Sequence, residues 1–324
     1  MCKDCPDEIV VACNGSPMVI GLGQGHTYLA SETSAFSRYT KNFIAMKDGE
    51  IGVVNSNGCS LDLSRTERAD QEDIPLSPAP YPHWTLRETL QQPEAIARSL
   101  AFGGRMSEDR VVLGGCDRAK DRLKHVRHLV LTACGTSLFA AMYGAKIMRD
   151  LEALDTAMAM DAGELRLTDI PRRSGGLLAV SQSGETRDVM KALKCAELAG
   201  VPRMSAVNAV GSAIARETKL GVYLNAGRET AVASTKAFTT QVTVMSLIAL
   251  WFRQLREEEH AKNNDQTSLP DKTKLFEALQ RLPISFGMTM RVRERCVEVA
   301  KAVKDKNHLF VLGKGYGEPV AYEV

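Results

Sequence analysis

From residue 127 onward, short runs of aliphatic and β-branched residues alternate with longer amphipathic stretches. Consecutive parallel strands need a long crossover connection, and a helix usually provides it. Strands joined in this way form one sheet with helices on both faces. We therefore predict an α/β fold built on a doubly wound, parallel, five-stranded sheet. The predicted strands span residues 128–133, 156–160, 177–180, 204–207 and 222–224.

Three helices are expected to follow strands of this sheet. The first begins near Ser137 and the second near Glu185, with Gly200 ending the second. The third follows Ser234 and is long and strongly apolar. Each has apolar residues three or four positions apart, which is the spacing of a helix that buries one face.

The part of the chain before this domain has a different pattern. Turn residues separate five short apolar runs, which predicts a mostly β structure. These runs span residues 9–12, 18–22, 27–30, 43–46 and 50–54. Lys47-Asp48-Gly49-Glu50 lies between the last two and predicts a β-hairpin. Residues 61–82 are charged and rich in proline, which indicates a surface linker, and residues 84–102 are helical with an interruption at Pro93.

The last part of the chain begins a pattern that has occurred before. Residues 272–282 and 291–303 are helical, and an apolar run at 308–312 predicts a new strand. His-Leu-Phe-Val-Leu-Gly-Lys-Gly-Tyr-Gly at 308–317 is similar to His-Leu-Val-Leu-Thr-Ala-Cys-Gly-Thr-Ser at 128–137. This internal repeat indicates a second α/β domain that has barely begun, so we expect the chain to be cut at its C-terminus.

Four parts are therefore predicted. They are a mostly β region at 1–68, a linker with a connecting helix at 69–105, the α/β domain at 106–262, and the truncated start of a second domain at 263–324.

Composition excludes several classes of protein. The net charge of +2 gives no reason to expect nucleic acid or an anionic membrane as a partner. The longest apolar run, at 242–252, is about half of the roughly 20 residues that a spanning helix needs. No secretory signal follows Met1, so the eight cysteines are expected to be reduced thiols in the cytoplasm. Cys2 and Cys5 form a single CxxC without a second pair, so no zinc site is predicted.

Three loops rich in hydroxyl groups follow predicted strands, at residues 133–137, 181–186 and 232–236. Ligands of doubly wound sheets bind at the carboxyl ends of the strands. Unpaired N–H groups at a helix start attract an anion, and serine and threonine hydroxyls add donors. One such loop would be explained by ordinary helix capping. Three loops at one edge favour a small anionic ligand such as a phosphate.

The same residues carry a resemblance to a known family. Ser-Gln-Ser-Gly-Glu-Thr at 181–186 resembles the signature of the sugar isomerase (SIS) domain, which has a flavodoxin-like fold. Cys-Gly-Thr-Ser at 134–137 and Val-Ala-Ser-Thr-Lys-Ala-Phe-Thr-x-Gln at 232–241 are similar to the glutamine–fructose-6-phosphate aminotransferases. His-Trp-Thr-Leu-Arg-Glu at 83–88 looks like the segment that joins their glutaminase and isomerase parts. Residues 15–32 look like the end of their glutaminase domain, which is of the N-terminal-nucleophile type.

The resemblance implies a function and a set of contacts. The family makes glucosamine 6-phosphate from fructose 6-phosphate and glutamine, for UDP-N-acetylglucosamine synthesis. Its isomerase domains associate, which implies a homo-oligomer, and it needs no cofactor or metal. The implied substrate-binding residues are Thr136, Ser137, Ser181, Gln182, Ser183, Thr186, Val232 and Ser234. Of these, Val232 and Ser234 would lie along the sugar, and all the others except Thr136 would hold its phosphate.

No catalytic residue carries over. The family opens with Cys-Gly-Ile, whereas this chain has Cys2-Lys3-Asp4 and lacks the stretch that binds glutamine. The family's general-base glutamate, ring-opening histidine and Schiff-base lysine match no position here, and Glu323 matches an earlier glutamate. Lys236 at a helix start is expected to be packed or paired rather than nucleophilic. We expect the chain by itself to be inactive.

Two alternatives remain at this stage. A non-catalytic sensor could retain a SIS domain for binding sugar phosphates, but it would have no use for the linker and the glutaminase-like strands. A sugar-phosphate isomerase without an amidotransferase part predicts no match to the aminotransferases across residues 8–95.

Overall fold

The computed structural model describes residues 3–13, 18–31, 33–47, 49–68, 77–264 and 267–323. Cys2, the turn at 14–17, Glu32 and Asp48 lie outside the described residues. Contacts divide the chain into two compact units, Met1–Ser77 and Pro78–Val324. The four predicted parts stay predictions, because a division by contacts does not test the finer boundaries.

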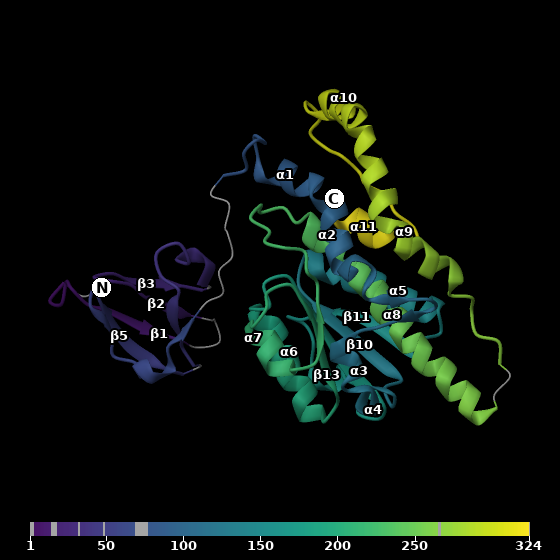
Figure 1. Cartoon of the computed structure of the whole chain (residues 1–324), viewed down its shortest axis with the longest axis horizontal. Helices are drawn as coiled ribbons and strands as arrows, with labels where there is room; N and C mark the ends of the chain where they lie inside the picture. Colours follow the sequence, from purple (N-terminus) through teal and green to yellow (C-terminus); the bar gives the residue numbers. More distant parts are fainter. Residues whose placement is uncertain are drawn as a thin grey trace. The chain divides into compact units, whose positions relative to one another are not determined.

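The first unit is mostly β, as predicted (Figure 1). All of its strand pairs are antiparallel, and Ile20 and Ile44 are fully buried in its core. One sheet has the order β1-β5-β6 and the other β3-β2-β4-β7. The elements are β1 (Ile9–Ala12), β2 (Val19–Leu22), β3 (Thr27–Ala30), η1 (Thr33–Ala35), β4 (Asn42–Ala45), β5 (Ile51–Asn55), β6 (Gly58–Cys59), η2 (Leu63–Arg65) and β7 (Glu67–Arg68).

The hairpin predicted around Lys47 and Gly49 is wrong. The chain does turn there, because the Glu50 N–H donates to the Lys47 carbonyl at 3.1 Å. However, β4 pairs with β2 and β7, whereas β5 pairs with β1 and β6. The turn therefore passes from one sheet to the other. Turn residues set a local reversal of the chain, but burial of the flanking strands decides which partners they take.

The second unit contains the predicted five-stranded sheet. Its order is β11-β10-β12-β13-β14 and every pair is parallel. These strands are β10 (His128–Ala133), β11 (Thr156–Asp161), β12 (Gly175–Ser181), β13 (Arg203–Val207) and β14 (Gly221–Tyr223). A short antiparallel pair, β8 (Met106–Ser107) with β9 (Arg110–Val111), precedes them.

Helices cover both faces of this sheet (Figure 1). Along β10, Leu129 and Leu131 face α5 and α8, whereas Val130 between them faces α6. This alternation is why the strands are apolar on both sides. The helices before and within the domain are α1 (Trp84–Leu90), α2 (Gln92–Ser99), η3 (Ala101–Gly103), α3 (Gly114–Asp117), α4 (Lys120–Leu123), α5 (Thr136–Asp150), η4 (Leu167–Asp169), α6 (Arg187–Ala199), α7 (Ala213–Thr218) and α8 (Lys236–Asn263).

From Thr273 to Glu323 the chain is helical except for an irregular segment between α10 and α11. The helices are α9 (Thr273–Thr289), η5 (Met290–Val292), α10 (Arg293–Val303) and α11 (Gly317–Glu323). Rings stack between α11 and α5, with the Phe139 and Tyr322 centroids 5.6 Å apart. The strand predicted at 308–312 is wrong, because this segment is irregular and Phe310 is 86% exposed. No strand of the described residues pairs with it, and a strand is not stable without a partner.

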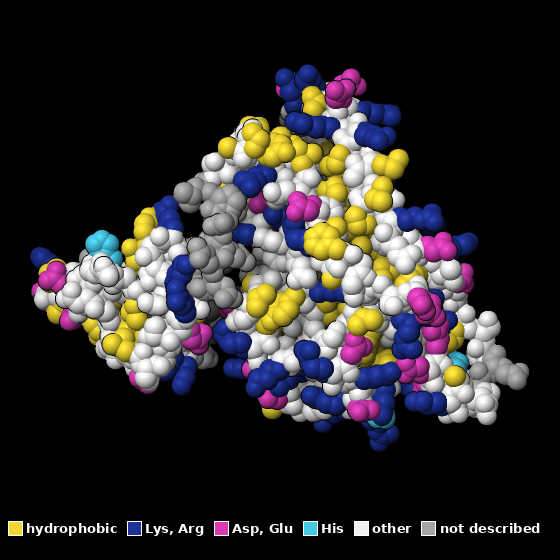
Figure 2. All heavy atoms as spheres, viewed as in Figure 1, with side chains coloured by type: hydrophobic (Ala, Val, Ile, Leu, Met, Phe, Trp, Pro, Cys, Tyr) yellow, Lys and Arg dark blue, Asp and Glu magenta, His cyan; other side chains and the backbone are white. Residues whose placement is uncertain are grey.

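Hydrophobic side chains are also exposed along α9, where Ile284 and Met288 lie at the surface (Figure 2). Among the helices of the described residues, none has the length and apolar character needed to cross a bilayer.

Candidate functional site

The site predicted from the sequence begins where β10 ends. Gly135 precedes α5 with φ 55° and ψ −137°, a conformation that only glycine adopts readily. Glycine has no side chain, and no side-chain hydrogen bond caps the start of α5. The first N–H groups of α5 are therefore not taken up by a capping side chain. Thr136 and Ser137 follow at once and are half-buried.

The second loop, residues 181–186, is a tight turn between β12 and α6. Ser181 is 3% exposed, and its Oγ accepts the Gly184 N–H at 3.0 Å and lies 3.2 Å from Thr186 Oγ1. Ser183 Oγ accepts the Glu185 N–H at 3.2 Å. Thr186 occupies the N-cap of α6, but its side chain makes no capping hydrogen bond.

Gly184 in this loop cannot be replaced by a larger residue without strain. Its φ is +67°, and an added Cβ would lie 2.0 Å from Ser212 Oγ. The Gly184 carbonyl accepts the Ile214 N–H at 2.9 Å, and Glu185 Oε1 accepts the Ala213 N–H at 3.0 Å. These bonds tie the loop to the start of α7. The loop is thus held in one shape without any ligand.

Helix capping was the competing explanation for these hydroxyl groups. In α5 and α6 it does not hold, because neither N-cap residue caps its helix with a side chain. The N–H bonded to Ser183 belongs to Glu185, which precedes α6. Both helix starts therefore keep the N–H groups and the positive end of the dipole that attract an anion.

The sheet topology brings these two loops together. β10 and β12 are neighbours, with Thr132 opposite Ala179, so their carboxyl ends leave the same edge of the sheet. α5 and α6 then pass to opposite faces. The order of strands reverses between β10 and β12, and doubly wound sheets bind ligands in the crevice at such a reversal. The first two predicted loops lie on either side of this crevice.

The third loop differs from the expectation. The N–H groups at the start of α8 are already bonded to an anion of the chain itself, because Glu229 Oε1 accepts the N–H groups of Thr235 and Ala237 at 2.8 and 3.1 Å. Ser234 Oγ also lies 3.3 Å from Glu229 Oε2. The prediction of an open anion-binding site at this loop is therefore wrong. The Val232 side chain is fully exposed.

Two residues beside the first loop, Gln241 and Glu323, were not among the predicted site residues. Gln241 is 0% exposed on α8, and its Nε2 donates to Ser137 Oγ at 2.8 Å. α11 brings Glu323 to Thr136, where burial raises the pKa of its carboxyl; the bond to Thr136 opposes this shift and the Glu229 carboxylate adds to it. Gln241 stood at the end of the motif at 232–241, but only the fold brings it to Ser137.

Lys236 has the packed position that was expected. It is 4% exposed, and its Nζ donates to Gln91 Oε1 at 2.9 Å. Burial lowers the pKa of its ammonium group, whereas the Glu88 carboxylate opposes that shift. Within the described residues, no group of three histidine, cysteine or acidic side chains is arranged to hold a metal ion.

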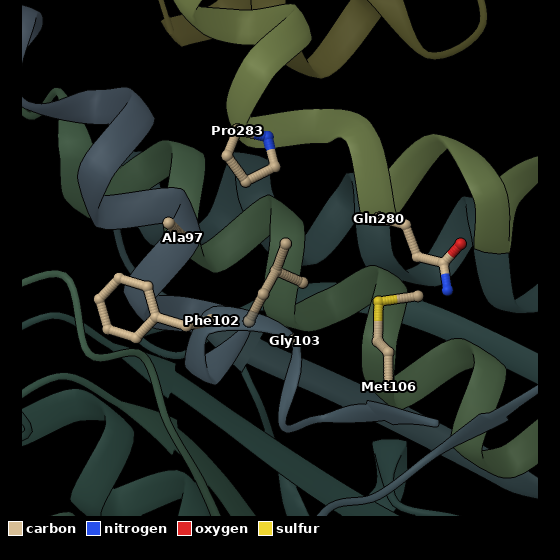
Figure 3. Close-up of a pocket in the computed structure, with 7 residues that line it drawn as sticks. Ala97, Phe102, Gly103, Met106, Gln280 and Pro283 are labelled. Atoms are coloured by element: carbon tan, nitrogen blue, oxygen red, sulfur yellow. The ribbon is translucent and has the colours of Figure 1, made fainter. Parts of the chain in front are cut away.

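A separate hollow of about 300 Å3 lies between α2, β8 and α9 (Figure 3). Its lining is mainly apolar and includes Phe102, Met106 and Pro283, with Gln280 at one side (Figure 3). It contains no cation and no free helix start among these lining residues. These lining residues therefore offer an anion no positive group to bind. The candidate anion site remains the edge between β10 and β12.

Comparisons with known proteins point to the same region. Residues 122–251 match the SIS domain family. The glutamine–fructose-6-phosphate aminotransferase (isomerizing) of Chlorobaculum tepidum is 33% identical over 327 residues, covering 98% of this chain and 52% of that protein. The enzyme of the same name from Bacteroides thetaiotaomicron is 31% identical over 331 residues, covering 99% and 52%. The chain thus spans about half the length of the curated relatives it matches.

Solved structures give the same picture. The C-terminal domain of glucosamine-fructose-6-phosphate aminotransferase from Francisella tularensis aligns with a TM-score of 0.67 and 27% identity, covering 76% of this chain and 66% of that chain. Glucosamine-6-phosphate deaminase of Thermotoga maritima, at 19% identity and a TM-score of 0.50, covers 74% and 65% and shares the fold. Residues 122–251 form a SIS domain, and along nearly its whole length the chain is similar to glutamine–fructose-6-phosphate aminotransferases.

Proposed function

We propose that the edge between β10 and β12 binds the phosphate group of a sugar phosphate, with fructose 6-phosphate and glucosamine 6-phosphate as its ligands. The observation that carries this proposal is the pair of helix starts, α5 and α6, that lack side-chain caps at the reversal of the strand order. Ser137, Ser181, Gln182, Ser183 and Thr186 would hold the phosphate.

Several features favour a phosphate over a carboxylate at this edge. A phosphate has three terminal oxygens that accept hydrogen bonds, and two loops with hydroxyl and N–H donors can serve them together. Thr136, Val232 and Ser234 would lie along the sugar. Glu229 carries negative charge at the third loop, which suits sugar hydroxyls better than a second phosphate.

At the level of the whole enzyme, we propose that the chain supplies the sugar-phosphate part of an aminotransferase. That enzyme would use glutamine and fructose 6-phosphate to make glucosamine 6-phosphate, act in the cytosol, and associate through its SIS domains. The match to aminotransferases over 98% of the chain includes the region at 8–95. This favours an aminotransferase over an isomerase without an amidotransferase part.

Substitution of Ser183 by alanine tests the phosphate site. Hydrogen bonds to a charged group contribute about 1.5–3 kcal/mol, so Ser183→Ala should weaken binding of fructose 6-phosphate roughly ten- to a hundredfold. Calorimetry on the 324-residue chain would measure this, with unphosphorylated fructose as a second ligand that should bind poorly. Ser107→Ala, at an exposed position of β8, is the matched control and should bind as the parent does.

Thermal unfolding should accompany the calorimetry. A loop serine makes few packing contacts, so the melting temperature should change little. If Ser183→Ala binds the phosphosugar as tightly as its parent, Ser183 only shapes the turn before α6 and the site proposal fails.

A further inference from the structure

The segment between β14 and α8, residues 224–235, has no helix or strand of its own. It nevertheless contains Val232 and Ser234, two of the predicted sugar contacts. A segment without regular structure keeps one shape only if other groups bond its backbone. Side chains of the connecting helices α1 and α2 supply several of these bonds.

The first of these side chains is Glu88 on α1. It is 1% exposed, and its Oε1 accepts the Thr230 N–H at 2.6 Å. Its Oε2 accepts the Ala231 N–H at 3.2 Å. A buried carboxylate is costly unless donors satisfy it, and here two successive backbone groups do so. These bonds fix the backbone at Thr230 and Ala231, the two residues immediately before Val232.

The second is Arg98 on α2. Its Nε donates to the Asn225 carbonyl at 3.2 Å, and a terminal nitrogen donates to the Ala226 carbonyl at 2.8 Å. A salt bridge of 2.6 Å to Glu94 orients the guanidinium. Arg98 thus holds the beginning of the segment, and Glu88 holds its middle.

The end of the segment is also tied to the same helices, by the bond from Lys236 to Gln91. Two residues of the α/β domain also form hydrogen bonds with the segment or with the helix that follows it. Asn208 bonds the Ala226 N–H and the Gly227 carbonyl, and Glu229 bonds the first turn of α8. Within the described residues, the backbone N–H groups of Thr230 and Ala231 donate to the Glu88 carboxylate.

We propose that Glu88 and Arg98 are positioning residues for the sugar-facing segment at 224–235, so that the connecting helices α1 and α2 are part of the sugar site. Both residues lie outside 122–251, the extent of the SIS match. A SIS domain cut at those limits would keep its phosphate loops but lose the bonds that shape this segment. The statement about sugar rests on the proposed function; the statement about the shape of the segment does not.

Hydrogen exchange tests the shape of the segment without any ligand. Glu88→Gln keeps the size of the side chain but removes its charge and turns one acceptor into a donor that faces an N–H group. Exchange at Thr230 and Ala231 should become about tenfold faster, while β10 and β12 exchange as in the parent. Arg98→Met should do the same for the backbone near Asn225 and Ala226. Glu277→Gln and Arg281→Met, at exposed positions of α9, are matched controls.

Binding then separates the segment from the phosphate loops. Glu88→Gln should weaken fructose 6-phosphate binding about tenfold and leave the affinity for inorganic phosphate unchanged. Ser183→Ala should weaken both. If the parent binds neither ligand, the proposed function fails, and exchange alone decides the role of Glu88.

Three results would overturn the inference. Unchanged exchange at Thr230 and Ala231 in Glu88→Gln would show that the segment keeps its shape without these bonds. Faster exchange throughout the sheet would show a general structural role. Equal loss of phosphate and phosphosugar affinity would show that Glu88 does not act on the sugar side. If Glu88→Gln does not fold, the same measurements on Arg98→Met apply.

Discussion

At the scale of single residues, Gln241 shows how a buried neighbour can set the role of a ligand-binding hydroxyl. Because Gln241 Nε2 donates to Ser137 Oγ, the hydroxyl hydrogen of Ser137 is left to point elsewhere. In this orientation Ser137 can donate to an anion. The amide oxygen of Gln241 is buried and has no hydrogen-bond partner among the residues that the structure describes.

A double-mutant cycle tests this arrangement. Gln241→Met keeps the volume but removes the donor, so phosphate binding should weaken about three- to tenfold, as expected for a neutral hydrogen bond of about 1 kcal/mol. In a Ser137→Ala background the same substitution should have no further effect. Calorimetry with inorganic phosphate gives both values, and an equal loss in both backgrounds would contradict the proposed role.

The cysteines differ in a way that thiol labelling can measure. Burial raises the pKa of the Cys116 thiol to about 12, and the neighbouring Asp117 adds to the shift. At pH 8 its reactive thiolate is therefore almost absent, whereas Cys5 and Cys296 are exposed. Native protein treated with iodoacetamide at pH 8 should be modified at Cys5 and Cys296 and spared at Cys116, as read by mass spectrometry. Equal labelling of Cys116 and Cys296 would be the contrary result.

At the scale of elements, the sequence predicted β10 to the residue, because its ends coincide with changes in polarity. The two strand-level errors have a common cause. The turn after Lys47 and the apolar run at 308–312 have the correct local signals, but pairing depends on residues far away in the sequence. Local patterns show that a segment could be a strand; they do not show what it pairs with.

At the site, too, local signals predicted only part of the arrangement. The two loops at β10 and β12 could be predicted, because motif and strand order together place them at one edge. The hydrogen bonds from the start of α8 to Glu229 could not be predicted, because they depend on how the segment before α8 folds back. Nor could the bonds of Glu88, whose partners lie more than 140 residues away.

Glu229 gives a prediction for the stability of α8. Glu229→Ala removes the acceptor for two N–H groups of the first turn, and loss of such a cap costs about 1–2 kcal/mol. For a unit of this size the melting temperature should fall by roughly 2–8 °C. Thermal unfolding followed by circular dichroism would measure it against Glu277→Ala at an exposed site. An unchanged melting temperature would mean that water replaces the cap without cost.

At the scale of the whole molecule, the resemblance assigns no catalytic residue to any position of this sequence. We therefore expect the 324-residue chain to bind phosphosugar but not to turn it over. It should release no ammonia from glutamine and form no glucosamine 6-phosphate, as measured by coupled assays for the two products. Turnover that Cys2→Ala abolishes would show that the N-terminus has been misjudged.

The exposed segment at 308–312 has a consequence for handling the protein. Leu309 and Leu312 are 68% and 92% exposed, and the run from Leu309 to Leu312 has no charge and no proline. Short uncharged stretches of this kind, left unpaired, can add to strands of other molecules and start aggregation. β10 has a similar apolar sequence but is protected by two neighbouring strands and two layers of helix. We therefore expect this exposed segment, which contributes nothing to the core, to favour association of the chain as its concentration rises.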